Sequence, residues 1–271
     1  MDGAEAIRAF EKAGWQKAAA TYEGFAKATR QFIPALLDAA GVEEGRRVLD
    51  VACGPGFLTA EAAKRGGVAR GLDFSPAMLD VARRLHPRIA FDEGDAEALP
   101  YDDASFGCVV SNFGVHHVPR PALALKEAFR VLRPGGRVTF SFWAAPVENI
   151  AWKLVFDAIR RVGDPAASRA PPPGGGFGAP ENCAAALVEA GFSSVETRRE
   201  NGVWHHADGR ALLEAFRGGT ARMAALIECQ PAGAVEAIAA DIEAAAMAYR
   251  QDGELRLPIA AYVTHGVKQQ G

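Results

Sequence analysis

Short apolar runs alternate with amphipathic stretches through the middle of this chain. The runs cover residues 48–52, 68–72, 106–111 and 138–143, and glycine, proline or aspartate separates them from stretches of helical periodicity. Buried strands that alternate with helices are typical of βαβ units, whose strands are parallel. The pattern therefore predicts an α/β fold built on a doubly wound, mostly parallel sheet.

Two of the intervening helices carry clear boundary signals. Ser75 precedes Pro76, a pair that suits the N-cap and the first helical position, so a helix is predicted to begin there. Pro134 opens a Pro-Gly-Gly sequence, which predicts that the preceding helix ends and that a strand begins at Arg137.

The parts of the chain before and after the alternating region have other patterns. Residues 5–40 are rich in alanine and aromatic residues and predict two helices, the second begun or bent by Pro34. Proline and glycine fill residues 170–180, which predicts a mobile connection or lid. Residues 207–249 have helical periodicity, whereas 257–264 alternate with period two, as expected of a final strand.

These patterns predict four regions. Residues 1–40 would form an N-terminal helical cap, 41–200 the α/β core, 201–254 an inserted helical lid, and 255–271 the final strand of the core. The inserted lid would thus lie before the last strand.

Composition and charge exclude several classes of protein. Hydrophobic residues make up 49% and charged residues 23% of the 271 positions, as in ordinary globular proteins. The net charge of -3 offers no positive field for phosphate backbones, so no nucleic-acid partner is expected. No apolar stretch is long enough to span a bilayer, and the opening residues lack a secretory pattern, so we expect no membrane insertion and a cytoplasmic location.

The four cysteines, Cys53, Cys108, Cys183 and Cys229, are scattered and form no C-x-x-C pair. This spacing fits neither a zinc site nor a disulfide framework, so neither a metal nor a disulfide is expected.

A glycine-containing loop follows the first predicted strand in the sequence VLDVACGPGFLT, residues 48–59. Gly54 and Gly56 allow a ligand to approach the backbone, and the helix that follows offers free amide donors for an anion. A nucleotide-like cofactor fits this arrangement. The same pattern also serves NAD, FAD and structural turns, which this segment alone leaves open.

Two acidic residues narrow the choice of cofactor. Asp73 ends the second strand, where a carboxylate can accept both hydroxyls of a ribose. Asp95 follows the third strand, where it could accept a hydrogen bond from an adenine amino group. Thr59 stands where a dinucleotide fold would normally place its third glycine, which makes NAD the weaker candidate.

With these motifs in place, the sequence resembles the class I S-adenosylmethionine-dependent methyltransferases, in particular the small-molecule group of methyltransferase type 11 that includes quinone methyltransferases. The resemblance is specific over residues 46–143 and looser elsewhere. It rests on the segments VLDVACGPG, GLDFSPAML, GDAEALPYDDASFG, VVSNFGVHHV and EAFRVLRPGGRV. It implies a Rossmann-like fold with a seven-stranded sheet, and S-adenosyl-L-methionine as cofactor with S-adenosyl-L-homocysteine as product. Residues 41–200 would then be the core that binds this cofactor, and 201–254 the lid or substrate region.

The resemblance also implies roles for single residues around the cofactor. The methionine half would lie near Asp50, Ala52, Gly54 and Gly56, the ribose near Asp73, and the adenine near Phe74, Met78, Asp95 and Ala96, with Asn112 beside the cofactor. Ala52 replaces a glycine that is usual in the family. An alanine there is expected to cost little if its backbone angle is ordinary.

Catalysis of methyl transfer by in-line displacement chiefly needs alignment of the acceptor and the methyl group. His117 is the candidate base for an acceptor that must lose a proton, and Tyr22 is expected to fold over the cofactor. Trp143, Trp204 and His205 are candidates for the acceptor pocket. Each of these side chains could instead serve only in packing.

The predicted function is methyl transfer to an O, N or C atom of a small, ring-containing metabolite. One alternative is a catalytically silent protein of this fold that binds the cofactor or acts as a scaffold, which Ala52 and the lack of an unmistakable base make conceivable. An NAD-linked oxidoreductase is less favoured. The acceptor and the oligomeric state are not readable from the sequence.

Overall fold

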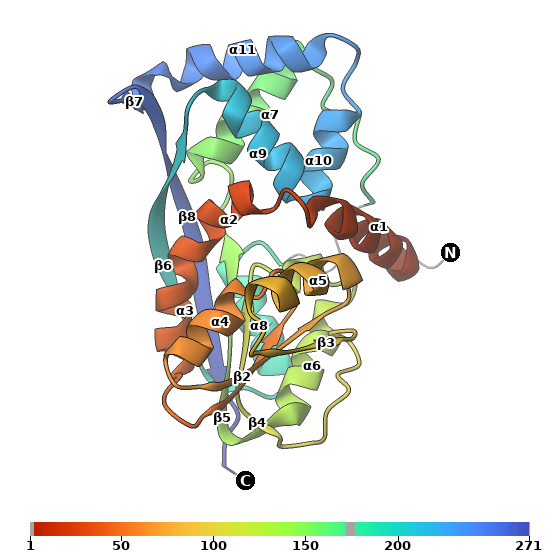
Figure 1. Ribbon diagram of the computed structural model, residues 1–271, viewed down its shortest axis with the longest axis vertical. Coiled ribbons are helices and arrows are strands. Elements are labelled where there is room, and N and C mark those ends of the chain that lie inside the picture. Colours follow the sequence, from red (N-terminus) through yellow and green to blue (C-terminus); the bar gives the residue numbers. More distant parts are fainter. Residues whose placement is uncertain (1–2, 172–176, 271) are drawn as a thin grey trace.

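The computed structural model describes residues 3–171 and 177–270 and has a central, mainly parallel sheet (Figure 1). The spatial order is β3-β2-β1-β4-β5-β8-β6, in which β8 runs antiparallel between β5 and β6. The predicted α/β class with a sheet of about seven strands is confirmed. The strands are β1 Arg47–Val51, β2 Val68–Asp73, β3 Ala90–Glu93, β4 Phe106–Asn112, β5 Leu132–Trp143, β6 Ser193–His206 and β8 Glu254–Val267, and the two-residue β7 Arg250–Gln251 pairs with β8.

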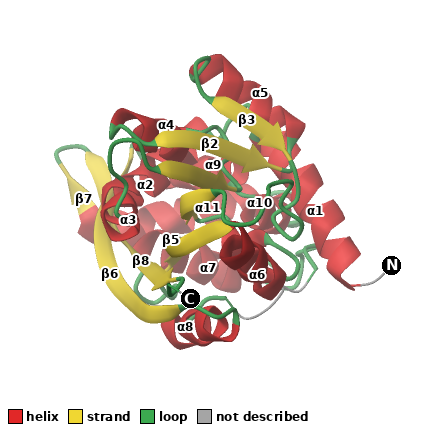
Figure 2. Cartoon of the chain, turned by 90° about the horizontal axis from the view of Figure 1, so that it is seen from below, coloured by secondary structure: helices red, strands yellow, loops and turns green. Residues whose placement is uncertain are grey.

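Helices cover both faces of the sheet, as Figure 2 shows. Side chains of α3 and α4 share one apolar cluster with strand residues, and those of α6 and α8 share another. The helices are α1 Gly3–Ala18, α2 Glu23–Thr29, α3 Ile33–Ala40, α4 Phe57–Lys64, α5 Pro76–Leu85, α6 Pro121–Val131, α7 Ile150–Val162, α8 Pro180–Glu189, α9 Gly209–Gly219, α10 Ala221–Glu228 and α11 Ala234–Ala246, with short 3₁₀ turns η1 Arg30–Phe32, η2 Val115–His117 and η3 Met247–Tyr249.

Strand β1 shows how the sequence builds these layers. Successive side chains of a strand point to opposite faces. Val48 accordingly lies in the cluster under α3 and α4, whereas Leu49 and Val51 lie in the cluster under α6 and α8. Asp50 shares the face of Val48 and receives a hydrogen bond from Thr59 of α4.

The boundary signals read from the sequence agree with the structure at Ser75 and partly at Pro134. The Ser75 side chain accepts a hydrogen bond from the backbone N–H of Met78 and caps α5. The helix α6 ends before the Pro-Gly-Gly sequence, but β5 begins at Leu132 and runs through it with a shift of register. Regular pairing with β4 resumes at Arg137, where the strand was predicted to begin.

The N-terminal region holds three α-helices. Pro34 lies in the first turn of α3, which packs against the sheet, whereas α1 and α2 lie between the sheet and the upper group of helices (Figure 1). Within the stretch predicted to be irregular, 170–180, residues 172–176 lie outside the described residues, and Pro180 already begins α8.

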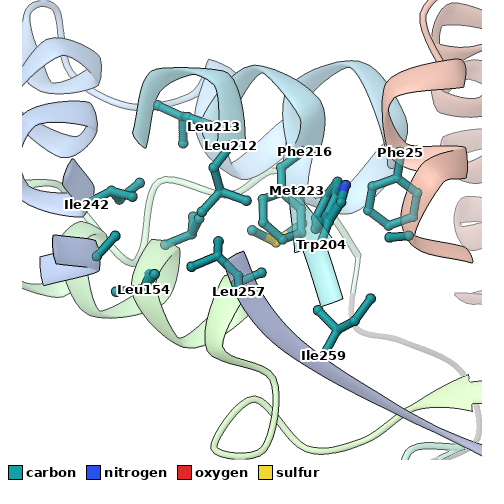
Figure 3. Close-up of a cluster of buried hydrophobic side chains, with 14 of the residues drawn as sticks. Phe25, Leu154, Trp204, Leu212, Leu213, Phe216, Met223, Ile242, Leu257 and Ile259 are labelled. Atoms are coloured by element: carbon teal, nitrogen blue, oxygen red, sulfur yellow. The ribbon is translucent and has the colours of Figure 1, made fainter. Parts of the chain in front are cut away.

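A second apolar core lies above the sheet and joins α7, α9, α10 and α11 to the ends of β6 and β8 (Figure 3). Trp204 of β6 is 1% exposed and packs edge-on against Phe25 of α2 and Phe216 of α9. The sequence around residues 194–198 predicts only a modest strand, whereas β6 runs on to His206. Both long strands thus tie the inserted helices to the sheet.

Among the residues that the structure describes, no helix has both the length and the apolar character needed to cross a membrane.

Candidate active site

A cavity opens at the carboxyl ends of β1, β2 and β4, where open α/β sheets bind ligands. Its void volume, including the part open to solvent, is about 730 Å³. Side chains of α1, together with Tyr22 just before α2, form part of its wall. The lining residues are Arg8, Trp15, Tyr22, Ala52, Gly54, Pro55, Leu72, Asp73, Phe74, Met78, Gly94, Asp95, Ala96, Asn112, Phe113, Gly114, His117, Val118 and Pro119.

Asp73 is held rigidly at the end of β2. One carboxylate oxygen accepts the N–H of Gly54 at 2.8 Å, and the other accepts the N–H of Ser75 at 2.9 Å. Burial raises the pKa of Asp73 to about 6, although backbone hydrogen bonds from Ser75, Gly54 and Phe74 oppose the rise. Each oxygen keeps a lone pair, so Asp73 can still accept hydrogen bonds from two hydroxyl groups of a ligand in the cavity.

The glycine loop adopts the left-handed backbone conformation at three positions. Gly54 has φ of +52° and Gly56 has φ of +79°, and a Cβ at Gly56 would lie 2.7 Å from the Phe91 ring. Ala52 also has a positive φ, of +56°. The condition under which alanine would cost little, an ordinary backbone angle, is therefore not met at Ala52, because an L-residue in this region is strained by about 1–2 kcal/mol.

The methyl group of Ala52 fits because Gly114, at the end of the neighbouring strand β4, has no side chain. A Cβ at Gly114 would lie 2.6 Å from the Ala52 Cβ and 2.6 Å from the Ser111 Oγ. The space between residues 52 and 114 therefore holds only one Cβ, and the glycine at position 114 makes room for the alanine at position 52.

The pairing of Ala52 with Gly114 predicts non-additive effects on stability. Gly114→Ala should lower the free energy of unfolding by about 1–3 kcal/mol through overpacking. The double variant Ala52→Gly/Gly114→Ala should recover part of that loss, with a coupling of at least about 0.5 kcal/mol. Urea denaturation of the four proteins measures this cycle. Additive losses would show that the two positions do not share the space.

Asp50 borders a smaller adjoining cavity, together with Tyr22, Gly54 and Asn112. Its Oδ2 accepts the hydroxyl of Thr59 at 2.6 Å, whereas the buried Oδ1 has no hydrogen-bond partner among the described residues. Burial raises the pKa of Asp50 to about 7, and Thr59 opposes the rise. A buried carboxylate oxygen without a partner is suited to receive a cationic donor from a ligand.

Phe74, Met78, Asp95 and Ala96 lie together on the cavity wall formed after β2 and β3. Helix α1 reaches this wall through Arg8, whose guanidinium lies 3.1 Å from the Asp95 carboxylate and 2.7 Å from that of Glu97. The cap is thus tied directly to the loop that carries Asp95.

The end of β4 is held in place by hydrogen bonds. The side chain of Asn112 donates to the carbonyl of Thr29 at 3.1 Å and accepts from Ser141 at 2.7 Å. Phe113 follows with φ of +58° and stacks on Trp143 with ring centroids 4.0 Å apart. Phe113 therefore presents an aromatic face to the cavity, and Trp143 supports it from behind.

His117 also lines the cavity, and its nearest charged partner was not found from the sequence. Its Nδ1 lies 3.2 Å from the carboxylate of Glu11, which is fully buried in α1. Glu11 also pairs with Arg222 of α10 at 2.7 Å and accepts the indole N–H of Trp15 at 3.0 Å. The one available signal was that Glu11 and Trp15, four positions apart, share a helix face.

Tyr22 lies at the start of α2 and lines the cavity beside Trp15, with ring centroids 6.1 Å apart. Burial raises the pKa of Tyr22 to about 12; Thr29 opposes the rise and the Asp73 charge adds to it. The phenol is therefore neutral near pH 7 and serves as a hydrogen-bonding and aromatic surface, not as a base.

The structure does not bring every candidate residue to the cavity. Among the described lining residues, neither Trp143 nor Trp204 is included; the first supports Phe113, and the second is buried in the upper core. Period-two alternation along β6 turns His205 to the opposite face from Trp204. There it is exposed and pairs with Glu254 at 2.9 Å.

Comparisons with known proteins agree with this fold. Residues 49–140 match the family model described as a methyltransferase domain. Demethylmenaquinone methyltransferase of Renibacterium salmoninarum is 42% identical over 118 residues, which cover 44% of this chain and 50% of that protein. Malonyl-[acyl-carrier protein] O-methyltransferase of Erwinia billingiae is 36% identical over 161 residues, covering 54% and 64%.

The crystal structure of the YcgJ protein from Bacillus subtilis shares the fold, with a TM-score of 0.59 at 20% identity over 89% of this chain and 99% of that one. These findings confirm the resemblance to class I S-adenosylmethionine-dependent methyltransferases, which residues 49–140 match as a methyltransferase domain. The chain spans about half the length of the demethylmenaquinone methyltransferase that it matches.

Proposed function

We propose that this protein transfers a methyl group from S-adenosylmethionine to an O, N or C atom of a small, ring-containing acceptor. The observation that carries the proposal is the convergence of Asp50, Asp73 and Asn112 on connected cavities at the carboxyl edge of a methyltransferase domain. The demethylmenaquinone methyltransferases among its relatives support an acceptor with a ring.

The residues present fit the cofactor. The unpartnered Oδ1 of Asp50 can receive an ammonium group, Asp73 can accept two ribose hydroxyls, and Phe74 and Met78 offer apolar contact for a base. When bound, the sulfonium supplies a methyl group that is already activated for displacement. The chain itself then has to orient the acceptor, exclude water and receive a proton.

The wall of the cavity favours an aromatic or quinone-like acceptor. Trp15, Tyr22 and Phe113 present aromatic surfaces there, and His117 lies among them as the candidate group to receive a proton. Aromatic side chains bind flat rings by stacking and edge-on contacts. A small phenol or quinol would therefore combine ring contacts with an acidic O–H.

The direct test is calorimetric titration with S-adenosylhomocysteine, S-adenosylmethionine and NAD in parallel, followed by a screen of small phenols and quinols with a labelled methyl donor. Binding of the first two ligands and label transfer to an acceptor would support the proposal. Binding of both without transfer to any acceptor would favour a silent cofactor-binding protein. Binding of NAD alone would overturn it.

An NAD-linked oxidoreductase is disfavoured by what Thr59 does in the structure. Its hydroxyl is committed to Asp50, and the side chain is fully buried between β1 and α4. Thr59 thus donates a hydrogen bond from the position where a dinucleotide fold usually has glycine, which allows close packing of the helix.

The raised pKa of Asp50 predicts that S-adenosylhomocysteine binds more tightly as the pH rises. A carboxyl with a pKa of about 7 is increasingly neutral below that pH, and only its ionised form pairs with the ligand's ammonium. Affinity should therefore rise by up to about tenfold per pH unit between about pH 5.5 and about pH 7, measured by calorimetry.

Adenosine provides the matched control because it lacks the ammonium and reports Asp73 without Asp50. Its affinity should follow only the titration of Asp73, whose pKa is about 6. Asp50→Asn keeps an acceptor for Thr59 and should bring the pH dependence of S-adenosylhomocysteine close to that of adenosine. An unchanged pH dependence in Asp50→Asn would contradict the assignment.

A further inference from the structure

Glu11 is a buried carboxylate on the cap helix α1 to which the proposed function has so far given no role. Its side chain is 0% exposed, and its partners come from three separate elements. Trp15 of α1 and His117 of η2 face Oε2 at 3.0 and 3.2 Å, whereas Arg222 of α10 faces Oε1 at 2.7 Å. Burying a charge in this way is costly unless every partner is positioned to offset it.

Glu11 is ionised in this setting. Burial raises its pKa, but the proximity of His117 and Arg222 and the hydrogen bond from Trp15 outweigh the burial and hold the pKa below its usual value. An ionised carboxylate only accepts hydrogen bonds. His117 Nδ1 lies 3.2 Å from Oε2 and can approach a carboxylate favourably only as a protonated donor, although the contact has an ion-pair distance and not the alignment of a hydrogen bond.

The His117 ring is fixed in orientation as well. Its Nδ1 is shielded from solvent, so the 18% exposure of the side chain belongs to the other ring atoms. Trp15 packs edge-on at a centroid distance of 4.9 Å, and the half-buried ring of His116 lies 4.1 Å away in a tilted arrangement. The edge of His117 that faces away from Glu11 is thus the one available to the cavity that this residue lines.

We propose that Glu11 is a positioning residue that keeps the proton of His117 on Nδ1 and its free electron pair on Nε2, directed to the acceptor. This inference rests on the proposed function and adds a named device to it. In the transfer step the acceptor's proton moves to Nε2, its freed electron pair forms the bond to the methyl carbon, and the carbon–sulfur bonding pair remains on sulfur. Glu11 stays ionised and stabilises the resulting imidazolium.

Because Arg222 belongs to α10, the position of the Glu11 carboxylate depends on the contact between the cap helix α1 and the inserted helices. Its Nε holds Oε1 of Glu11, and its Nη1 donates to the Pro171 carbonyl at 2.7 Å. The two helices approach closely at Gly14, where a Cβ would collide with Ala221 of α10. The carboxylate therefore takes its place only when α1, α10 and the loop after β4 are assembled.

Glu11→Gln tests the device because Arg222 dictates how the new amide must lie. The amide oxygen can face either the Arg222 guanidinium or the indole N–H of Trp15, and the charged donor should win, which turns the NH₂ group to His117 and costs Trp15 its acceptor. His117 then has to accept at Nδ1, so its proton should move to Nε2. Nitrogen-15 NMR of histidine-labelled, ligand-free protein distinguishes the two tautomers, with the His117 signals assigned from the His117→Ala spectrum.

We expect the Nδ1-protonated tautomer to dominate in the natural protein and the tautomer ratio to change at least about tenfold in Glu11→Gln. Glu11→Asp, which keeps the charge, should retain the original tautomer in part. Glu97→Gln is the matched control, because Glu97 is also a buried carboxylate, 3% exposed, but pairs with Arg8 and Arg120. It should leave the His117 signals unchanged.

If His117 in the natural protein carries its proton on Nε2, the inference is wrong. This measurement tests the inference even if Glu11→Gln does not fold. An unchanged tautomer in a folded Glu11→Gln would overturn it too. Titration of the same samples with S-adenosylhomocysteine separates the two proposals. If the natural protein failed to bind that ligand, the proposed function would fail whatever the tautomer, whereas Glu11→Gln should bind it within about twofold of the natural protein.

Discussion

Replacement of Asp73 by alanine is expected to weaken binding of S-adenosylhomocysteine by about 1–3 kcal/mol, which is about 5- to 150-fold in affinity. The reason is local. Both oxygens of Asp73 are fixed by the N–H groups of Gly54 and Ser75, and their remaining lone pairs face the cavity. Loss of the carboxylate leaves the ribose hydroxyls without an acceptor. Calorimetric titration measures the change.

Because alanine also leaves two backbone N–H groups without their acceptor, a ligand series is needed to isolate the ribose contact. In the natural protein, 2′,3′-dideoxyadenosine should bind more weakly than adenosine. In Asp73→Ala the two ligands should bind almost equally, since the group that distinguishes them is gone. Equal discrimination by both proteins would remove Asp73 from the ribose site, whatever the loss in overall affinity.

Replacement of His117 by alanine is expected to lower kcat by about 10²- to 10⁴-fold for an acceptor that must lose a proton. The histidine lines the cavity with one ring edge and faces Glu11 with the other, so it is placed to receive a proton and to stabilise the charge that results. Asp73 and Asp50 are untouched by the substitution. The affinity for S-adenosylhomocysteine should therefore remain within about threefold.

The measurement is the rate of label transfer to the acceptor found in the screen, at saturating methyl donor. His265→Gln serves as a control for loss of a partly buried histidine, because His265 lies on β8 beside Arg137 and Glu196, in a separate surface hollow. It should leave the rate unchanged. Normal turnover in His117→Ala would exclude this residue from the mechanism and with it the role proposed for Glu11.

The sequence predicted the layers of the fold because local chemistry and tertiary structure agree there. Apolar runs between glycine and proline formed the parallel strands, and Ser75 before Pro76 marked the start of α5. The length of β6 was underestimated because residues 196–201 are polar without interruption, and Asn201-Gly202 resembles a turn. Pairing with β8, distant in sequence, carries the strand through that point.

The sequence predicted those site residues that directly follow a strand. It did not predict Glu11, which the N-terminal helical cap contributes. Asp73 is placed by the end of its own strand, so the sequence indicates its position. Glu11 meets His117 only through the packing of α1 over the sheet, and no local pattern signals a contact between residues so distant in the chain. The backbone strain at Ala52 was likewise invisible, since the residue type does not reveal its φ.

The central place of β8 has a consequence for the order in which the chain can fold. During synthesis β5 emerges well before residues 254–267, which later cover its free edge. Until then an edge rich in apolar residues is open to pairing with another chain, a known route to aggregation. Between the synthesis of β5 and that of β8, the chain also adds α9, α10 and α11, whose apolar faces pack against β8 as well. Shortened versions of this protein that end before β8 should therefore accumulate as aggregates rather than as smaller folded units.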